Sequence, residues 1–213
     1  MLNKKLILGT VAGAVLAFTT GSFASGVAHA CPPVDHGQPH FYFGAGAGYG
    51  NQHWNNQYNS AVMDAHPNAF AGQVFGGYAF NNFLSVQGDA TLLTHTSFTL
   101  NGQNGETKEK TYALDLVGRL TVPPMPGATN LRFFGFVGPS LLRTELQGVV
   151  PAGMKEDRNH FGVTYGAGAT YKTSQNCSLF VKWQRFGGNG INSLNQFQAS
   201  VDVFLIGGEY HIA

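Results

Sequence analysis

The sequence is poor in charge and has no long apolar run. Asp, Glu, Lys and Arg make up 11% of the residues, whereas typical soluble domains contain about 25%. After the first thirty residues, no uninterrupted apolar segment reaches the roughly 20 residues that a membrane-spanning helix needs. The net charge of +1 offers no basic stripe for nucleic acid. These absences exclude nucleic-acid binding and helical spans. Together with abundant glycine and aromatics, they favour a barrel solvated by lipid.

The first thirty residues have the pattern of a cleavable secretion signal. Lys4 and Lys5 form a basic start, Leu6–Phe18 is apolar, and Ala28-His29-Ala30 matches the A-x-A cleavage pattern. The apolar stretch is too short to cross a bilayer as a helix, although a retained signal anchor is an alternative. We therefore expect a signal peptide at 1–30, a proline-rich periplasmic leader at 31–39 and a single domain at 40–213.

Cysteine is scarce as well. Cys31 and Cys177 are the two in the chain, and neither lies in a C-x-x-C motif or a Cys/His cluster, so no metal or cofactor site is expected. A secreted chain enters an oxidising compartment, which permits a Cys31–Cys177 disulfide. Two alternatives stay open: lipidation of Cys31, which directly follows the cleavage site, and two unpaired thiols.

Eight stretches of the chain alternate apolar residues with small or polar ones. In 161–172, Phe161, Tyr165 and Tyr171 share one face, and glycine and threonine fill most of the other. An apolar face framed by aromatics suits a strand that faces lipid. A soluble ligand carrier would need the reverse pattern. The predicted fold is all-β, an eight-stranded antiparallel up-and-down transmembrane β-barrel in the bacterial outer membrane.

The connections between these stretches alternate in length. Long connections follow the first, third, fifth and seventh strands, and shorter turns follow the others. In bacterial barrels the long loops lie outside and the short turns lie in the periplasm, so both termini are expected to be periplasmic. Strands are expected at 40–50, 69–80, 111–122, 131–145 and 161–172, with three more beginning at Leu84, near Cys177 and at Ala199. The strand 131–145 is apolar on both faces, which leaves its orientation open.

Even- and odd-numbered residues of a strand point to opposite faces, and this parity predicts two turns and raises one question about the last strand. Side chains that oppose each other must share a face, which pairs Phe80 with Leu84 and Thr173 with Cys177 across three-residue turns. In the last strand, Asp202 has the parity of the outward residues. Either Asp202 lies above the membrane, which we expect, or a bulge at Gly207-Gly208 switches the parity.

Eight strands enclose a lumen that side chains can fill. Glycines 166 and 168 would oppose Gln184 and Lys182 and so make room for them. Asp115 and Arg119 stand about 13 Å apart along one strand, so they need partners on neighbouring strands. We interpret the inward polar residues as a structural plug and take an ion or proton path as the alternative. The network comprises Gln73, Gln87, Asp89, Asp115, Arg119, Lys182 and Gln184.

Polar residues recur in the expected outer loops. An outer-leaflet lipid-modifying enzyme would need His beside Ser or Asp, as at His95 with Ser97 or at Asp64 with His66. Such pairs also arise by chance in polar loops, so no catalytic residue is assigned. His53 with His66 is a weak candidate for a metal pair, and His160 lies near another loop. Trp54 and Tyr58 suit either contact with host molecules or glycans or a loop that packs on itself, and Trp183 suits the interfacial aromatic girdle.

Three segments resemble the small outer-membrane β-barrel family that includes the opacity-type surface proteins and the barrel of outer-membrane protein A. Phe41–Gly50 resembles the aromatic and glycine-rich first strand, and Gly76–Gln87 resembles the second hairpin. Gly207–Ile212 resembles the C-terminal assembly signal, although the chain ends in Ile212-Ala213 where Phe or Trp is usual. The resemblance implies surface exposure, structural or adhesive roles and often no enzymatic activity.

The sequence thus predicts a non-enzymatic outer-membrane barrel with a structural or adhesin-like role through its long loops. A lipid-modifying enzyme of the small-barrel type and a narrow-pore channel are the alternatives. The expected partners are outer-membrane lipid and lipopolysaccharide, the outer-membrane assembly machinery at the C-terminal strand, and a host or glycan ligand at the loops.

Overall fold

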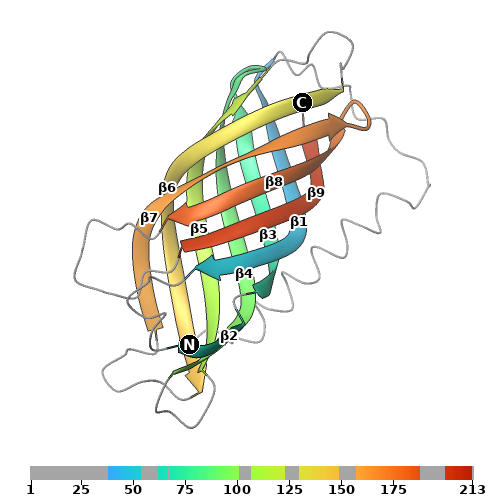
Figure 1. Ribbon diagram of the computed structural model, residues 1–213. Coiled ribbons are helices and arrows are strands. Elements are labelled where there is room, and N and C mark those ends of the chain that lie inside the picture. Colours follow the sequence, from blue (N-terminus) through green and yellow to red (C-terminus); the bar gives the residue numbers. More distant parts are fainter. Residues whose placement is uncertain are drawn as a thin grey trace, which may run out of the picture. The chain divides into compact units, whose positions relative to one another are not determined.

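Antiparallel strands form almost all of the described residues and close into a barrel (Figure 1). The structure is a computed structural model that describes residues 38–53, 62–66, 68–100, 107–122, 130–148, 157–187 and 200–212. The strands are β1 (His40–His53), β2 (Val62–His66), β3 (Asn68–Ala79), β4 (Leu84–Leu100), β5 (Thr107–Thr121), β6 (Leu131–Gly148), β7 (Asp157–Lys172), β8 (Cys177–Gly187) and β9 (Ser200–Ile212). They pair in the order β2-β4-β3-β1-β9-β8-β7-β6-β5, and β4 also pairs with β5, which closes the wall. Within the described ranges, no helix is long and apolar enough to cross a membrane.

β2 and β3 lie one after the other along the same edge of β4, so together they occupy one strand position of the barrel wall. Both β2 and β3 pair with β4, with His66 opposite Ser97 and Ala71 opposite Leu93. The predicted eight-stranded antiparallel barrel is therefore confirmed. Between the expected strands 40–50 and 69–80 the sequence predicted loop only, which was wrong, because β1 continues to His53 and the long β4 offers backbone partners to β2.

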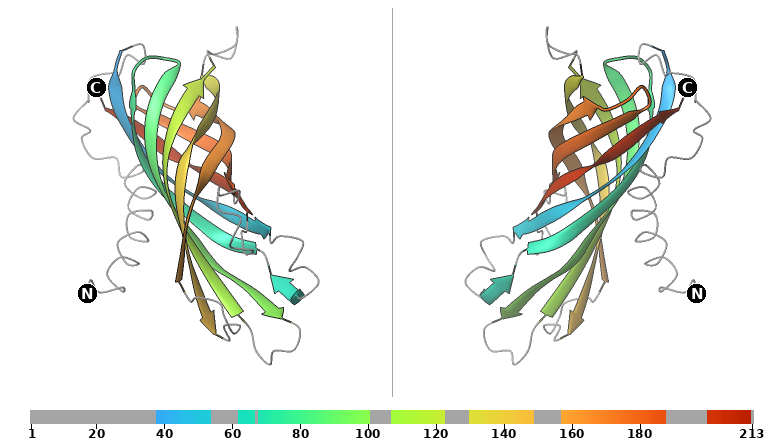
Figure 2. Two further views of the ribbon diagram at one scale, coloured as in Figure 1. Left: turned by 90° about the vertical axis from the view of Figure 1, so that its left-hand side faces the viewer. Right: turned by 90° about the vertical axis from the view of Figure 1, so that its right-hand side faces the viewer.

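The two ends of the barrel differ in strand length. We call one end of the barrel the turn end. There β1, β4, β6 and β8 begin, and β3, β5, β7 and β9 end. The opposite end is the loop end. The strands β4, β5, β6 and β7 are 17, 15, 18 and 16 residues long, whereas β1, β3, β8 and β9 have 14, 12, 11 and 13. Figure 2 shows the longer four reaching past the others at the loop end.

Three of these strands run further than the sequence indicated. β5 begins at Thr107 instead of residue 111, β6 ends at Gly148 instead of residue 145, and β7 begins at Asp157 instead of residue 161. Their polar and glycine-containing ends resemble loops, yet backbone pairing continues from Thr107 opposite Gly148. A polar strand end is stable where the neighbouring strand continues to supply hydrogen-bond partners.

Both parity-derived turns are confirmed at the turn end. The Phe80 amide donates to the Leu84 carbonyl at 2.9 Å, and the Thr173 amide donates to the Cys177 carbonyl at 3.0 Å. In the first turn, Asn81 Oδ1 accepts hydrogen bonds from two following amides, those of residues 83 and 84, at 2.8 and 2.9 Å. This Asx geometry explains why asparagine follows β3.

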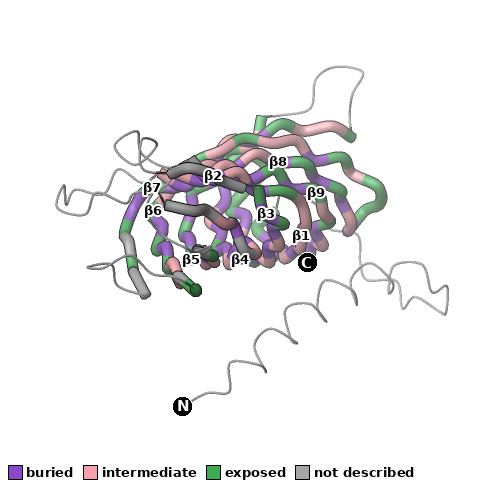
Figure 3. Tube along the Cα trace, turned by 60° about the horizontal axis from the view of Figure 1, so that its bottom comes forward, coloured by how far each residue is buried: buried purple, intermediate pink, exposed green. Residues whose placement is uncertain are grey.

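Buried and exposed residues alternate along the strands (Figure 3). The large exposed side chains are apolar, whereas the buried ones include many polar residues. β6, whose orientation was open, directs Phe134 and Phe136 inward and Phe133 and Val137 outward. Paired residues run without a shift from β8 through β9 to β1 across Gly207-Gly208. The bulge alternative is therefore excluded, and Asp202 keeps its outward parity.

Candidate functional site: the barrel lumen

A buried ion pair crosses the lumen near the turn end. Arg119 of β5 reaches Glu209 of β9, with Nη1 3.1 Å from Oε2 and side-chain exposures of 9% and 3%. The guanidinium lies 3.9 Å from the centroid of the Phe134 ring, which adds a cation–π contact. β5 and β9 are not neighbours in the wall, so the expectation of partners on neighbouring strands was wrong for Arg119. The lumen is narrow enough for long side chains to meet across it.

Two histidines continue this cluster to the turn-end opening. His211 Nε2 lies 3.4 Å from Glu209 Oε1, and His211 Nδ1 lies 3.0 Å from His40 Nε2. The Nδ1 of His40 is 2.9 Å from the Gln38 carbonyl, which can only accept, so this nitrogen carries a proton. A small pocket of about 50 Å³ opens here, lined among others by His40, Arg119, Arg132 and Glu209. It has room for a few waters.

A second ion pair lies deeper in the lumen. Lys182 Nζ of β8 is 3.8 Å from Asp89 Oδ2 of β4, and both side chains are almost fully buried. The Phe75, Phe136 and Phe180 rings surround the ammonium group, with centroids at 5.3, 5.3 and 6.0 Å. A carboxylate and three aromatic faces together compensate the cost of burying this cation.

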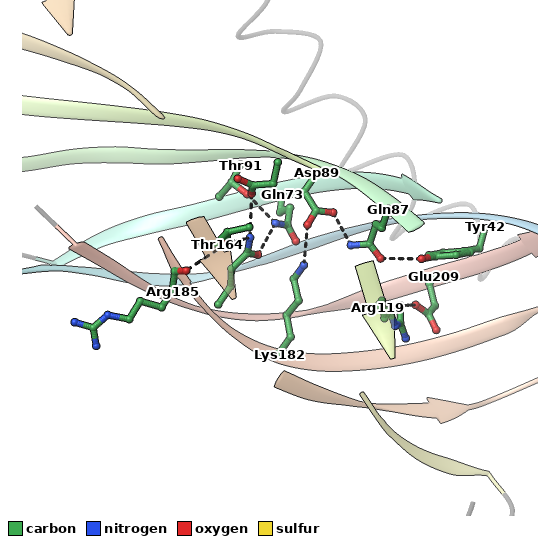
Figure 4. A network of polar contacts seen from close by, with 12 residues as sticks. Tyr42, Gln73, Gln87, Asp89, Thr91, Arg119, Thr164, Lys182, Arg185 and Glu209 are labelled. Carbon is green, nitrogen blue, oxygen red and sulfur yellow. Dashed lines mark hydrogen bonds and ion pairs between the residues drawn. The ribbon is translucent and has the colours of Figure 1, made fainter. Parts of the chain in front are cut away.

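Glutamines extend the polar network through the lumen, and one of them contacts the second ion pair (Figure 4). Tyr42 donates to Gln87 Oε1 at 3.1 Å, and Gln87 Nε2 donates to Asp89 Oδ1 at 2.5 Å. Gln73 Nε2 donates to Gln184 Oε1 at 2.9 Å, and Gln184 Nε2 donates to Asp115 Oδ2 at 3.0 Å. Figure 4 also shows the Arg185 guanidinium pointing away from this network. The structure thus places all seven sequence-predicted lumen residues in the interior. They are Gln73, Gln87, Asp89, Asp115, Arg119, Lys182 and Gln184.

Glycines on the inner face give the aromatic rings their space. Gly168 opposes Lys182, and Gly166 opposes Gln184, as parity predicted. A Cβ at Gly166 would lie 2.5 Å from the Phe136 ring, and a Cβ at Gly168 would lie 2.5 Å from the Phe134 ring. Such distances are far inside van der Waals contact, so the rings that contact the buried cations depend on these glycines.

An apolar layer fills the lumen on the loop-end side of the glutamines. Its members are less than a tenth exposed and include Ala71, Leu93, Leu142, Phe186, Val201, Val203 and Leu205. Beyond it, Thr96 Oγ1 donates to Gln52 Oε1 at 2.7 Å, and the side chain of Glu109 is also buried. The sequence analysis missed this layer.

Sequence reasoning also missed Tyr42, His40, Glu209 and His211. The signal was present in the parity rule, because Tyr210 and Ile212 face outward and their alternate neighbours therefore face inward. These polar residues lie within segments that had been considered only as family motifs.

Several of the candidates that the sequence suggested are not among the described side chains. The side chains of Asp64, His53, His66, His95 and His160, and residues Trp54 and Tyr58, lie outside the described parts of the chain. Among the side chains that are described, no group of three or more His, Cys, Asp or Glu could hold a metal ion. Trp183 faces outward, where its indole donates to Asp202 Oδ1 at 3.1 Å.

Cys177 begins β8 and is partly exposed, whereas Cys31 lies outside the described residues. The Cys31–Cys177 disulfide stays a prediction. Alkylation of the non-reduced, signal-cleaved protein followed by mass spectrometry tests it, and labelling of both thiols would contradict it.

Comparisons with known proteins agree with this architecture. Residues 10–203 match the family described as outer membrane protein beta-barrel domain. Neisserial surface protein A is 16% identical, with a TM-score of 0.58 over 80% of this chain and 96% of that chain. The attachment invasion locus protein of Yersinia pestis, solved with the heparin analogue sucrose octasulfate, is 14% identical, with a TM-score of 0.53 over 82% of this chain and 99% of that one. No curated protein sequence matches. The chain belongs to the outer-membrane β-barrel family, and its location is the bacterial outer membrane.

Proposed function

We propose that this outer-membrane barrel is a non-enzymatic protein with a closed lumen, which acts in envelope structure or surface interaction through its loop end. The observation that carries this proposal is the filled interior. Paired charges occupy the lumen from the turn end to its middle, and an apolar layer follows toward the loop end.

Each part of this interior opposes ion passage for a different reason. Moving Lys182 away from Asp89 would leave a buried charge without its partner, which is costly. An ion that passed this point would then meet Leu93, Phe186 and other apolar side chains that cannot replace its hydration shell. A narrow-pore channel is therefore the weaker alternative.

Conductance tests the closed lumen. Purified folded protein in a planar bilayer is expected to give no large, stable conductance, and liposomes that contain it should not swell in permeant sugars. A known open porin, reconstituted in parallel, serves as the positive control. Steady channels or sugar uptake would overturn the closed lumen and favour transport.

The proposed orientation directs the loop end to the cell exterior. Its support is that short turns join β3 to β4 and β7 to β8 at the turn end, whereas β4, β5, β6 and β7 extend further at the loop end. Bacterial barrels show this asymmetry, with short turns in the periplasm and long loops outside. Protease added to intact cells should therefore cut near Lys155 or Arg158. Protection there, with cleavage within 123–130, would reverse the orientation.

The interaction role follows the position of the loops. The structurally similar Yersinia pestis protein was solved with a sulfated sugar analogue, which makes anionic glycans a sensible first probe for this chain. Folded protein should bind in a glycan array or host-protein pull-down, and a variant with shortened 54–61 and 149–156 segments should lose that binding. Equal binding by the shortened variant would contradict a loop-mediated role.

A lipid analysis tests the absence of enzymatic activity. Cells that express the protein should have the same lipid A acylation, measured by mass spectrometry, as cells that lack it. A change that disappears in a His95→Ala variant would support the lipid-modifying alternative.

A further inference from the structure

The outer faces of β5 and β6 change from apolar to cationic over a few residues. Leu114 lies opposite Leu141, and both are about half exposed. The next outward pair toward the loop end is Tyr112 with Arg143, followed by Lys110 with Glu145 and Lys108 with Gln147. Outward pairs are about 7 Å apart along a strand, so the whole change occurs within roughly 20 Å.

The length of the strands places this cationic surface outside the hydrocarbon. At the turn end, the outward side chains of the same two strands are apolar up to the strand ends, as Leu120, Val122 and Phe133 show. A tilted strand crosses the hydrocarbon in about 9–11 residues. Counted from Thr121, β5 leaves the hydrocarbon near Thr111, so Lys108 and Lys110 lie in the headgroup region.

The surface is positive in spite of one acid. Arg143 Nη2 is 3.4 Å from Glu145 Oε1, with the Arg143 side chain 48% exposed and that of Glu145 19% exposed. Lys110 Nζ lies 5.0 Å from the centroid of the Tyr112 ring, which holds the lysine against the aromatic border. Lys108 is exposed. Among the described outward side chains of these loop-end segments of β5 and β6, three cations stand against one carboxylate, which leaves an excess of positive charge.

The opposite end of the wall has no such surface. Among the described residues, the outward side chains of the turn-end half are uncharged, and aromatic contacts join Phe41 to Tyr78 and Phe43 to Tyr210 there. The cationic surface is therefore specific to the leaflet that the loop end faces.

We propose that Lys108, Lys110 and Arg143 bind the phosphate groups of lipopolysaccharide in the outer leaflet. Arginine can donate two parallel hydrogen bonds to a phosphate, and lysine supplies a compact positive charge beside it. The adjacent apolar rows would contact the acyl chains of the same lipid, so headgroup and tail meet matched surfaces. This site rests on the proposed orientation of the barrel but is independent of whether the lumen conducts.

The test measures lipid binding to the folded full-length chain in neutral-detergent micelles. Three probes are titrated: lipopolysaccharide, enzymatically dephosphorylated lipopolysaccharide and phosphatidylglycerol. Intact lipopolysaccharide should bind most tightly, and added salt should weaken it because the contact is exposed. Equal binding of the dephosphorylated form would overturn the phosphate contact, and equal or tighter binding of phosphatidylglycerol would overturn lipopolysaccharide as the occupant.

Variants locate the site. Lys108→Gln, Lys110→Gln and Arg143→Gln should each weaken lipopolysaccharide binding by about fivefold at low salt, and the triple variant should lose the salt dependence. Glu145→Gln should strengthen binding, because it removes the carboxylate that pairs with Arg143. Arg132→Gln removes a cation that lines the lumen pocket at the turn end and not the outer face. It controls for a general loss of positive charge and should bind as the unchanged protein does. Unaltered affinity in a triple variant with the circular dichroism of a folded barrel would overturn the proposal.

Discussion

The two ends of this barrel have opposite arrangements of charge. Near the turn end, the outer face is apolar and aromatic, and the interior contains Arg119, Glu209 and two histidines. Near the loop end, the outer face carries Lys108, Lys110, Arg143, Glu145, Arg185 and Asp202, whereas much of the interior is apolar. The surrounding solvent explains this inversion. A wall in lipid must be apolar outside, whereas a wall that extends beyond lipid can bury its apolar face as a soluble sheet does.

The largest effect is expected from unpairing the buried charge at the turn end. Glu209→Ala leaves Arg119 buried without its counter-charge, so the free energy of unfolding should fall by about 3–5 kcal/mol. Urea unfolding in lipid vesicles measures it. Glu145→Ala, in the outer ion pair at the loop end, is the matched control and should change stability by less than about 1 kcal/mol. Equal losses in the two variants would remove the distinction between the ends.

The second-largest loss of stability is expected from removing side-chain volume from the apolar layer. Leu93→Ala leaves a cavity among fully buried side chains, and the expected loss of unfolding free energy is about 2–4 kcal/mol. The volume-conserving Leu93→Met should cost less than about 1.5 kcal/mol. If the alanine variant unfolds like the unchanged protein, the layer is loosely packed and does not seal the loop-end side.

A smaller loss of unfolding free energy is expected from adding a methyl group at a glycine that packs against an aromatic ring. A Cβ at Gly168 would lie 2.5 Å from both the Phe134 ring and the Val181 carbonyl oxygen. Gly168→Ala should therefore destabilise by about 1–3 kcal/mol. At Gly72 a Cβ meets nothing within 4 Å, so Gly72→Ala is the matched control and should leave the same urea midpoint. Tolerance of alanine at both positions would contradict the close packing of the lumen.

The smallest effects compare the same kind of contact at the two ends. Tyr112→Leu removes the partly exposed ring beside Lys110 and should cost about 0.5–1 kcal/mol. Phe134→Leu removes the ring that covers the buried Arg119 guanidinium and should cost about 2 kcal/mol. A reversed order of the two urea midpoints would show that burial does not control the strength of these contacts.

Sequence reasoning succeeded where a local rule was sufficient. Period-two alternation found the eight wall positions, and face-matching found both short turns and the pairing of Gly168 with Lys182. It failed at the loop-end boundaries, because polar residues such as Lys108 are compatible with both a loop and a strand that faces water. The extension of β5 depends on pairing with β6, which the sequence of β5 alone does not reveal.

Except in 131–145, which is apolar on both faces, the sequence by itself determined which strand residues face lipid, because neighbouring side chains on a strand point to opposite sides and lipid tolerates only apolar groups. The same alternation also directs the seven predicted polar residues into the lumen, where the structure has them buried. Only the tertiary structure decided their partners. Arg119 meets Glu209, and Lys182 meets Asp89, across a lumen whose width and stagger depend on closure of the whole sheet. Closure brings together strands far apart in sequence, so no local pattern contains those contacts.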